Sequence, residues 1–368
     1  MTSLVTVLDL PYPSAGGSVE LFLDLYSGAP AAFPARAFML APTEPTPPET
    51  PTGIELLHVP GKSITDPGFT PYVGRLAHAI KTAAGPANPQ LLHLHHLAFG
   101  ATPALLHAFP DRPGIAFVHG TDLLFAEQHR DQRSVLTHAA RAATTIVVPT
   151  WAMADRLRTI TPNIDPHKIH RIPWGIPDQL LDSPPQHRPR RPGTPLRVLY
   201  AGRLTEEKGV DLLLRAVTLA PRIELSVAAP RAQYTALADR LRTTHPAGPP
   251  IRYLGWFPRH RLWSVMADHD LLAMPSTTLE AMGLVALEAQ ACGLPVLYQP
   301  VPGLTEALGD TAQTTDFRTP HIAARTLELL SDSTSLLGEL RDAGRANAAR
   351  HRLSTTIRAI TELGTTLT

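Results

Sequence analysis

The sequence predicts an α/β protein made of two doubly wound, parallel-sheet domains. Its 368 residues are more than one ordinary domain requires. Short apolar runs alternate with helical stretches in both halves of the chain. Between the halves lies a basic, proline-rich segment, residues 183–195, which cannot form a helix or a central strand. We interpret this segment as an exposed linker; a phosphate-binding patch of arginines is the alternative.

The N-terminal domain is expected to span residues 1–182. The chain starts without a basic region or a long apolar stretch, so its first apolar run is interpreted as a strand and not as a signal peptide. The expected strands are short, apolar and rich in β-branched residues. They are Leu4–Leu8, Ala37–Leu40, Leu91–Leu94, Ile115–Val118 and Ile146–Val148.

The second domain is expected to span residues 196–350, and 351–368 are expected to form a separate C-terminal helix. A helix over Leu284–Ala291 should end at Gly293 and Pro295, which stop helices. A second helix is expected over Val210–Ala220, and Pro320–Thr368 should be helical with a break near Leu353. The expected strands are Arg197–Tyr200, Glu224–Ala228, Ile251–Leu254, Leu271–Met274 and Val296–Tyr298.

Composition excludes several classes of function. The net charge of +1 gives no field that would attract nucleic acid. No apolar run approaches the roughly 20 residues of a membrane-spanning helix, so stable membrane insertion is not expected. The single cysteine, Cys292, cannot form an intrachain disulfide, which fits a reducing, cytoplasmic compartment. Nothing in the sequence indicates an oligomeric state.

The segment Ala201–Gly209 follows an expected strand and opens a helix. Gly202 permits a tight turn, and Arg203 and Lys208 place two cations beside the helix start, where a diphosphate would bind well. A surface turn with scattered charges is the alternative. Lysine is rare in this arginine-rich chain, which favours a functional role for Lys208.

Residues 275–299 read as strand end, loop, helix and strand, and carry two carboxylates, Glu280 and Glu288. Gly283 lets the backbone approach a ligand closely, because it has no Cβ. The following helix start, with Leu284 and Val285, offers unpaired N–H groups to electron-rich oxygens. The two carboxylates would touch different parts of one elongated, hydroxyl-rich ligand; a solvated helix face is the alternative.

Three motifs in the N-terminal half follow expected strands. Gly16 and Gly17 form a glycine turn after the first strand. His119 ends a strand at the edge where α/β domains bind ligands, although many such histidines only make local hydrogen bonds. Asp122 would contact an acceptor or cap the helix that follows.

The segment Leu92–His96 carries three histidines, His93, His95 and His96. Imidazole is a good zinc ligand. However, His93 and His95 share one face of a strand while His96 points away, and no carboxylate or cysteine lies nearby in the sequence. We therefore expect a structural or site-lining role and no metal.

Together these motifs resemble the retaining glycosyltransferase family 4. The match consists of a Pro-Ser entry at Pro275, Glu280, a gap containing Gly-Leu-Val, Glu288, and Ala-x-Ala-Cys-Gly-x-Pro-Val. Ala281-Met282 departs from the family's more frequent Gly-Phe. This departure bears on which donor sugar is bound more than on the type of reaction. The resemblance implies the GT-B fold, two Rossmann-like domains facing across a cleft, with the last helix returning to the N-terminal domain.

The resemblance also implies roles for these residues. Arg203 and Lys208 would hold the diphosphate and stabilise it as it leaves, in a reaction by front-face attack without metal or cofactor. Glu288 would bind the ribose, and Trp256 or Phe257 would stack on the nucleobase or pack in the core. The implied catalytic residues are His119, Glu280, Arg203 and Lys208. The implied donor-binding residues are Gly16, Gly17, Gly202, Arg203, Lys208, Glu280, Gly283, Leu284, Val285 and Glu288.

The expected function is transfer from a nucleotide-diphospho-sugar, a UDP-hexose or UDP-hexosamine, to a small soluble acceptor. Residues 96–103 and 119–125 resemble actinomycete antibiotic glycosyltransferases that act on aminocyclitols such as 2-deoxystreptamine. Asp122 and Glu127 would suit a cationic acceptor.

Two alternatives remain open. A peripheral transferase with a lipid acceptor should carry a basic amphipathic helix. The candidate stretch, Gly74–Ala84, has only Arg75, His78 and Lys81 as basic residues. A non-catalytic sugar-nucleotide-binding protein is the other alternative, and the intact set of two cations and two carboxylates argues against it.

Overall fold

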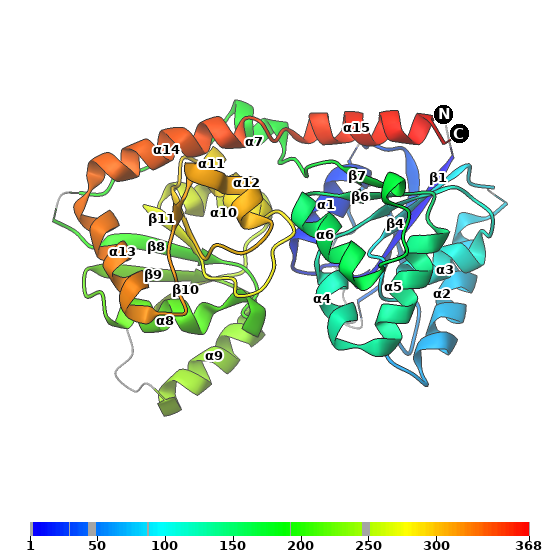
Figure 1. Ribbon diagram of the computed structural model, residues 1–368, viewed down its shortest axis with the longest axis horizontal. Coiled ribbons are helices and arrows are strands. Elements are labelled where there is room, and N and C mark those ends of the chain that lie inside the picture. The colour runs from blue at the N-terminus through cyan, green and yellow to red at the C-terminus, as the bar shows by residue number, and fades with distance from the viewer. Residues whose placement is uncertain are drawn as a thin grey trace. The chain divides into compact units, whose positions relative to one another are not determined.

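The computed structural model describes residues 3–28, 30–42, 49–86, 88–191, 193–244 and 251–367, which form two compact units (Figure 1). Unit 1 comprises Met1–Trp174 and Thr355–Thr368, and unit 2 comprises Gly175–Ser354. The chain thus passes from unit 1 to unit 2 before the short helix α7 (Asp178–Asp182), whereas the sequence predicted a domain boundary after residue 182. Most of the last helix, α15 (Leu353–Thr365), groups with unit 1.

The segment by which the chain enters unit 2 and the segment by which it leaves lie side by side. Ile176 and Arg352 form an isolated parallel bridge. The Ile176 amide donates to the His351 carbonyl at 2.9 Å, and the Leu353 amide donates to the Ile176 carbonyl at 2.9 Å. A Cβ at Gly175 would lie 2.4 Å from the Arg352 backbone. Only glycine at position 175 therefore allows these two backbone segments to approach this closely.

Unit 1 contains a seven-stranded sheet in the order β3-β2-β1-β4-β5-β6-β7, and every paired strand is parallel. The five expected strands are all present. β3 and β7, at the two edges, were not expected, because they have only four and three residues, of which one and two are exposed. The strands are β1 (Leu4–Pro11), β2 (Ala35–Leu40), β3 (Ile54–Leu57), β4 (Leu91–His95), β5 (Gly114–Phe117), β6 (Thr145–Val148) and β7 (Ile169–Arg171).

The helices of unit 1 bury apolar stripes that repeat at helical spacing. In α2 the buried side chains include Tyr72, Leu76 and Ile80. α15 packs closely on the sheet, since a Cβ at Gly364 would lie 3.4 Å from the Leu91 side chain. Besides α15, the helices are α1 (Gly17–Tyr26), α2 (Phe69–Ala84), α3 (Ala101–Ala108), α4 (Thr121–Gln128), α5 (Arg130–Ala142) and α6 (Trp151–Ile160), with a 3₁₀ turn at Pro166–Lys168.

Unit 2 contains a six-stranded parallel sheet in the order β10-β9-β8-β11-β12-β13. The five expected strands are present, and the two-residue β13 was not expected. The strands are β8 (Leu196–Ala201), β9 (Ile223–Ala228), β10 (Ile251–Gly255), β11 (Leu271–Met274), β12 (Val296–Tyr298) and β13 (Gln313–Thr314). These two parallel sheets confirm the predicted α/β class.

The helices of unit 2 follow its strands. α11 has the predicted bounds, and the C-terminal helical region is interrupted at Ser333 and again at 349–352. Besides α7, the helices are α8 (Val210–Thr218), α9 (Arg231–Thr244), α10 (Arg259–Ala267), α11 (Leu284–Ala291), α12 (Leu304–Leu308), α13 (Pro320–Asp332) and α14 (Thr334–Ala348), with 3₁₀ turns at Glu206–Lys208 and Gly309–Thr311.

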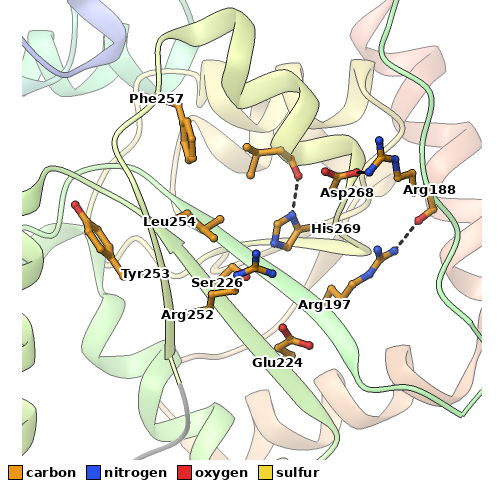
Figure 2. Close-up of a pocket in the computed structure, with 11 residues that line it drawn as sticks. Arg188, Arg197, Glu224, Ser226, Arg252, Tyr253, Leu254, Phe257, Asp268 and His269 are labelled. Carbon is orange, nitrogen blue, oxygen red and sulfur yellow. Dashed lines mark hydrogen bonds and ion pairs between the residues drawn. The ribbon is translucent and has the colours of Figure 1, made fainter.

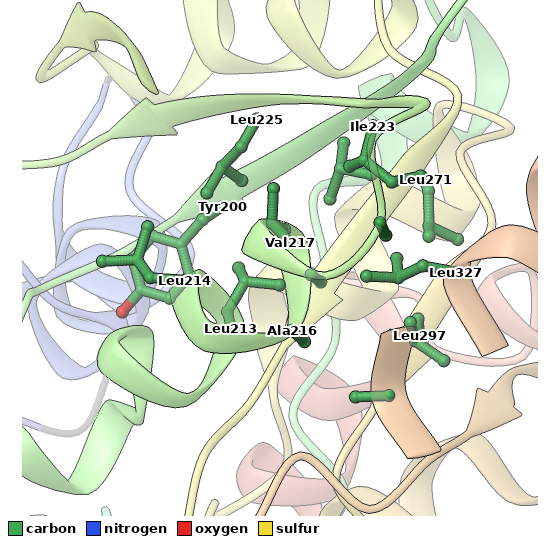
Figure 3. Close-up of a cluster of buried hydrophobic side chains, with 14 of the residues drawn as sticks. Tyr200, Leu213, Leu214, Ala216, Val217, Ile223, Leu225, Leu271, Leu297 and Leu327 are labelled. Carbon is green, nitrogen blue, oxygen red and sulfur yellow. The ribbon is translucent and has the colours of Figure 1, made fainter. Parts of the chain in front are cut away.

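The core of unit 2 joins α8 and α13 to the sheet (Figure 3). Leu213 and Val217 of α8 pack with Leu225 of β9 and Leu271 of β11, and Leu327 of α13 completes the cluster. All five side chains are at most 3% exposed. Burial of each such side chain contributes about 2 kcal/mol, so this core fixes the strands whose ends carry the motifs.

The proline-rich segment belongs to unit 2 and does not span between the units. The Arg188 amide donates to the Ala267 carbonyl at 2.9 Å, and the Arg188 guanidinium pairs with Asp268 at 3.2 Å. The Arg190 guanidinium donates to the Ser331 carbonyl at 2.8 Å. The segment is mostly exposed, as expected, but its expected role as the linker between the two domains is wrong, because it lies within unit 2. Pro192 lies outside the described residues.

The strand order reverses between β1 and β4 in unit 1 and between β8 and β11 in unit 2. Loops at such reversal points diverge and leave room for ligands at the carboxyl ends of the strands. The motif segments of the sequence follow β1, β4, β5, β8 and β11. The fold therefore brings the candidate residues of each unit to one sheet edge.

Candidate functional site

Two loops of unit 2, after β8 and after β11, are locked together at the carboxyl edge of the sheet. Gly209 has a φ of 67°, and a Cβ there would lie 2.1 Å from the Pro275 carbonyl oxygen. The Thr277 amide donates to the Glu207 carbonyl at 2.9 Å. Glycine is required at 209 because of its positive φ and because a Cβ would clash with the Pro275 carbonyl oxygen. The sequence motif ended at this residue, but its contact with the second loop is visible only in the structure.

Lys208 and Glu280 form an ion pair across these two loops. Their side chains are 24% and 11% exposed, and the Ser276 hydroxyl donates to the same carboxylate oxygen of Glu280 at 2.6 Å. The Arg203 guanidinium, by contrast, makes no ion pair or hydrogen bond within the described part of the chain. The Arg203 carbonyl accepts from the Tyr200 hydroxyl at 2.5 Å, which fixes the backbone of the turn after Gly202.

Gly283 begins α11 in the left-handed conformation, with φ 74°. The amides of Gly283, Leu284 and Val285 lie in the first turn, where a helix leaves its N–H groups to ligands. Gly303, which the sequence analysis did not select, supports this turn, because a Cβ there would lie 1.8 Å from the Glu280 carbonyl oxygen. The dipeptide Pro302-Gly303, which is typical of a turn, was the feature of the sequence that could have indicated it.

Glu288 lies on α11 but is only 4% exposed. One carboxylate oxygen accepts from Arg259 Nε at 2.8 Å, and the other accepts from Trp263 Nε1 at 2.8 Å. Both donors stand on α10, one turn apart, and neither was selected from the sequence. Glu288 is therefore buried in unit 2 with both carboxylate oxygens hydrogen-bonded, and its contact with a ribose stays a prediction.

Trp256, in the loop after β10, has a side chain that is 44% exposed. Of the two roles left open for it, core packing is thus wrong. Phe257 is half-buried and lines a cavity of about 540 Å³ (Figure 2). Apart from Phe257, that cavity contains none of the predicted site residues, and its Arg197 is already bound by Asp270 at 2.8 Å.

In unit 1, buried rings form a hydrogen-bonded chain that ends at His119. The Tyr26 hydroxyl lies 2.7 Å from His93 Nδ1 and 2.8 Å from His95 Nε2. His95 Nδ1 lies 3.0 Å from His119 Nε2. Burial lowers the pKa of His93 and of His119 to about 3, and lowers that of His95 well below its usual range. All three imidazoles are therefore neutral at pH 7.

The three histidines of the segment Leu92–His96 were considered as a zinc site. Within the described residues, no three His, Cys, Asp or Glu side chains are grouped as ligands for a metal ion. His93 and His95 direct ring nitrogens at Tyr26, and His96 packs edge-on against Phe99 with 5.4 Å between ring centroids.

Asp122 connects two turns of unit 1 from a fully buried position. Its carboxylate accepts from the Leu97 amide at 2.9 Å and from the His119 amide at 3.2 Å. Burial raises the pKa of Asp122 to about 6, although these amide donors oppose the rise. Asp122 is 0% exposed, so it cannot contact an acceptor, and it instead holds His119 beside the end of β4.

Gly16 caps α1 with φ 145°, and a Cβ there would meet no atom within 4 Å. Gly17 is exposed. This open helix start lies near the end of β1, where the structure adds a buried residue that the sequence analysis missed. Asp9 accepts from the Gly100 amide at 2.9 Å, and the Lys62 ammonium donates to the Asp9 carbonyl.

Comparisons with known proteins give the family of the chain. Residues 15–180 match the family model described as Glycosyltransferase Family 4, and residues 185–351 match that of Glycosyl transferases group 1. The chain belongs to the GT-B glycosyltransferases. The two models meet near the observed crossing from unit 1 to unit 2, and together they include every predicted site residue.

Among its relatives, this glycosyltransferase is 31% identical to a D-inositol 3-phosphate glycosyltransferase of Mycobacteroides abscessus, over 61% of this chain and 54% of the relative. It is 27% identical to one of Catenulispora acidiphila, over 94% of this chain and 90% of the relative. The chain thus spans about half the length of the first of these relatives.

Among solved structures, the fold matches sucrose-phosphate synthase from Thermosynechococcus elongatus with a TM-score of 0.82 and 18% identity, over 100% of this chain and 99% of that one. It matches Anabaena HepE, in complex with UDP and glucose, with a TM-score of 0.76 and 16% identity, over 100% of both chains. Among the described residues, none of the helices combines the length and the apolar character that spanning a lipid bilayer requires.

The neutral imidazoles predict that acid destabilises unit 1. In the unfolded chain, His93, His95 and His119 bind protons below their ordinary pKa of 6.5, whereas the folded chain keeps them neutral. The unfolded state therefore binds more protons, and the free energy of unfolding falls by up to about 1.4 kcal/mol per pH unit for each imidazole below pH 6.5. Asp122 acts in the opposite direction between pH 6 and its ordinary 3.8.

We expect a net loss of about 2 to 3 kcal/mol per pH unit between pH 6.5 and 5. Urea unfolding at a series of pH values measures it. A free energy of unfolding that is constant or rises on acidification would contradict the neutral state of these rings.

Proposed function

We propose that the chain is a retaining glycosyltransferase that moves a hexose or hexosamine from a UDP-sugar to a small soluble cyclitol. The expected acceptor is an aminocyclitol such as 2-deoxystreptamine, in antibiotic biosynthesis in the cytoplasm. The observation that carries the proposal is the group of Arg203, Lys208 and Glu280 beside the open start of α11.

The cations support transfer from a nucleoside diphosphate. Arg203 and Lys208 stand at the carboxyl edge of β8, where negative charge on a departing diphosphate would meet two positive charges. Because that charge grows in the transition state, the interaction accelerates the reaction and does not merely tighten binding. HepE, which shares the fold, is solved with UDP and glucose, in keeping with a UDP-sugar donor.

The first turn of α11 and Glu280 would hold the donor sugar. The amides of Gly283, Leu284 and Val285 suit a phosphate or sugar oxygen. One oxygen of Glu280 accepts from Ser276 and Lys208, which leaves the other to accept from a sugar hydroxyl. His119, which is partly exposed, is the residue we propose as a further contact for the donor sugar.

The proposed reaction uses no metal ion. The cations of unit 2 already supply the charge that a divalent ion would contribute at the diphosphate. We therefore propose front-face attack by the acceptor hydroxyl, with the leaving phosphate taking its proton. No side chain is assigned as a covalent nucleophile.

The acceptor class rests on the relatives. Their printed names give D-inositol 3-phosphate as substrate, which makes a cyclitol the expected acceptor here. The carboxylates first expected to attract an amine do not support it. Asp122 is buried, and Glu127 is bound by Arg156, whose Nε donates at 2.6 Å. The aminocyclitol proposal thus rests on the resemblance of residues 96–103 and 119–125.

A lipid acceptor is less well supported. The candidate membrane helix, α2, buries its apolar face inside unit 1, including Phe69, Tyr72 and Leu76. No apolar stripe is left on this helix to enter a lipid surface. A non-catalytic binding protein is disfavoured by the intact cation pair and by the ion pair of Lys208 with Glu280.

The experiment is a transfer assay of the full chain. UDP-, GDP- and dTDP-sugars are first ranked by thermal shift, and the best donor is incubated with 2-deoxystreptamine, inositol or inositol phosphate. We expect transfer from a UDP-sugar, an α-linked product by NMR, and unchanged activity in EDTA. A β-linked product would overturn the retaining mechanism, and loss of activity in EDTA restored by a divalent ion would overturn the metal-free site.

A further inference from the structure

A line of buried polar side chains leads to His119, and the proposed function uses only its last member. It runs from His93 through the Tyr26 hydroxyl to His95 and on to His119, with contacts of 2.7, 2.8 and 3.0 Å. Tyr26, His93 and His95 are at most 1% exposed, whereas His119 is partly exposed. The members come from α1, from β4 and from the turn after β5.

The rings around His95 leave it one orientation. Phe117 stacks on it with 4.7 Å between centroids and 10° between planes. Tyr26 meets it edge-on at 5.4 Å and 89°, and Phe22 does so at 5.1 Å and 78°. In a packed interior, a ring held on several sides cannot turn without displacing its neighbours. The two nitrogens of His95 therefore stay aimed at Tyr26 and His119.

Counting protons couples the state of His119 to that of His95. A neutral imidazole has one N–H, so one nitrogen donates and the other accepts. If His95 carries its proton on Nε2, it donates to Tyr26 and accepts from His119 Nε2–H, which leaves His119 Nδ1 as an acceptor. If the proton is on Nδ1, His95 donates to His119 Nε2, and His119 Nδ1 becomes a donor. The Tyr26 hydroxyl completes either arrangement.

We propose that Tyr26 and His95 are positioning residues, which fix the ring orientation and the tautomer of His119 so that its Nδ1 meets the donor sugar in one form. The inference rests on the proposed function for the sugar contact. A freely rotating histidine would present two nitrogens and two tautomers, so only a fraction of molecules would be competent. Fixing the ring in advance removes that loss.

The first test uses the unliganded full chain with ¹⁵N-labelled histidine. Ring-nitrogen shifts distinguish the two tautomers, and a His119→Gln spectrum assigns the His119 signals among the 17 histidines. We expect one dominant His119 tautomer in the wild type and a mixture in Tyr26→Phe. Unchanged His119 shifts in a folded Tyr26→Phe chain would overturn the proposal.

Tyr72→Phe is the matched control. Tyr72 is also 0% exposed in unit 1, and its hydroxyl has no hydrogen-bond partner within the described residues. In the transfer assay, Tyr26→Phe should lower kcat by about tenfold, the lower end of the losses that follow removal of a partner orienting a metal-bound histidine, and leave the acceptor KM unchanged. Tyr72→Phe should change neither. Equal losses in both variants would mean that the hydroxyl of Tyr26 is merely structural.

A pair of variants at His95 separates its two contacts. An asparagine amide falls near the position of Nδ1 and can keep the link to His119, whereas a glutamine amide falls near Nε2 and keeps the link to Tyr26. His95→Asn should therefore retain more kcat than His95→Gln. The reverse order, or equal kcat values, would contradict the positioning role.

The failure of this inference is distinguishable from that of the proposed function. If the wild-type chain transfers no sugar from any donor, the proposed function fails. The NMR comparison of Tyr26→Phe with Tyr72→Phe still decides whether Tyr26 and His95 fix His119, because it needs no substrate.

Discussion

Replacing Arg259 with alanine is expected to lower the free energy of unfolding by about 3–5 kcal/mol, because it leaves a buried carboxylate without its countercharge. The Arg259 and Glu288 side chains are 11% and 6% exposed, and one guanidinium nitrogen lies 2.7 Å from the carboxylate. Trp263 would remain as a donor to Glu288, at 2.8 Å. One neutral donor compensates for only part of the lost pair.

Urea unfolding followed by tryptophan fluorescence measures this effect, since Trp263 itself contacts Glu288. Arg261→Ala is the matched control. Arg261 stands on the same helix, is exposed, and forms no ion pair within the described residues. The control should change the stability by less than about 0.5 kcal/mol. Equal midpoints for Arg259→Ala and Arg261→Ala would show that the buried pair contributes nothing to the fold of unit 2.

The same pair bears on donor binding. A ribose could reach Glu288 only if Arg259 moved or shared the carboxylate, because both oxygens have donors in this structure. Glu288→Gln keeps the shape of the side chain and weakens the charge-assisted contacts. Calorimetry of UDP binding to this variant therefore shows whether Glu288 meets the nucleotide or serves unit 2 alone.

Replacing Lys208 with alanine is expected to raise the activation free energy by about 3 kcal/mol, because a developing negative charge loses its partner. This increase lowers kcat by roughly two orders of magnitude. Lys208 is 24% exposed and lies beside Glu280, so its ammonium can reach both a ligand and that carboxylate. Steady-state kinetics at saturating donor measures the change. Lys81→Ala, an exposed lysine on α2 of unit 1, is the control and should have wild-type kinetics.

A double-mutant cycle with Glu280→Gln separates two roles of Lys208. If Lys208 only holds Glu280 in place, its removal costs nothing further once the carboxylate is neutral. If it contacts the diphosphate, Lys208→Ala lowers kcat in both backgrounds. If Lys208→Ala lowers kcat only in the chain that keeps Glu280, then Lys208 supports Glu280 and does not contact the diphosphate.

Local pattern predicted the parts of the fold that depend on neighbours in sequence. The apolar runs located ten strands, nine in the interior of the two sheets and β10 at an edge, and Gly293 with Pro295 ended α11 where predicted. The edge strands β3 and β7 were missed, because a short strand with one face in solvent has too few residues to show a pattern.

The division of the chain was predicted less well, because linkers were inferred from composition. Residues 183–195 have the composition of an exposed linker, yet Arg188 and Arg190 bind carbonyls and carboxylates of unit 2. The crossing instead lies at Gly175, whose need for glycine arises from the Arg352 backbone, far away in sequence. No local signal reports such a contact.

What the sequence alone determined is the α/β class, the order of most elements and the motif residues at the strand ends, since each follows from short-range periodicity and turn chemistry. Tertiary structure decided which of those residues can meet a ligand. Lys208 and Glu280, 72 positions apart, became a pair at one sheet edge. Glu288 and Asp122 became buried and bound, because burial depends on the α10 and β4 neighbours that packing supplies. A carboxylate's role follows from its surroundings, and these are set by long-range contacts that no local pattern encodes.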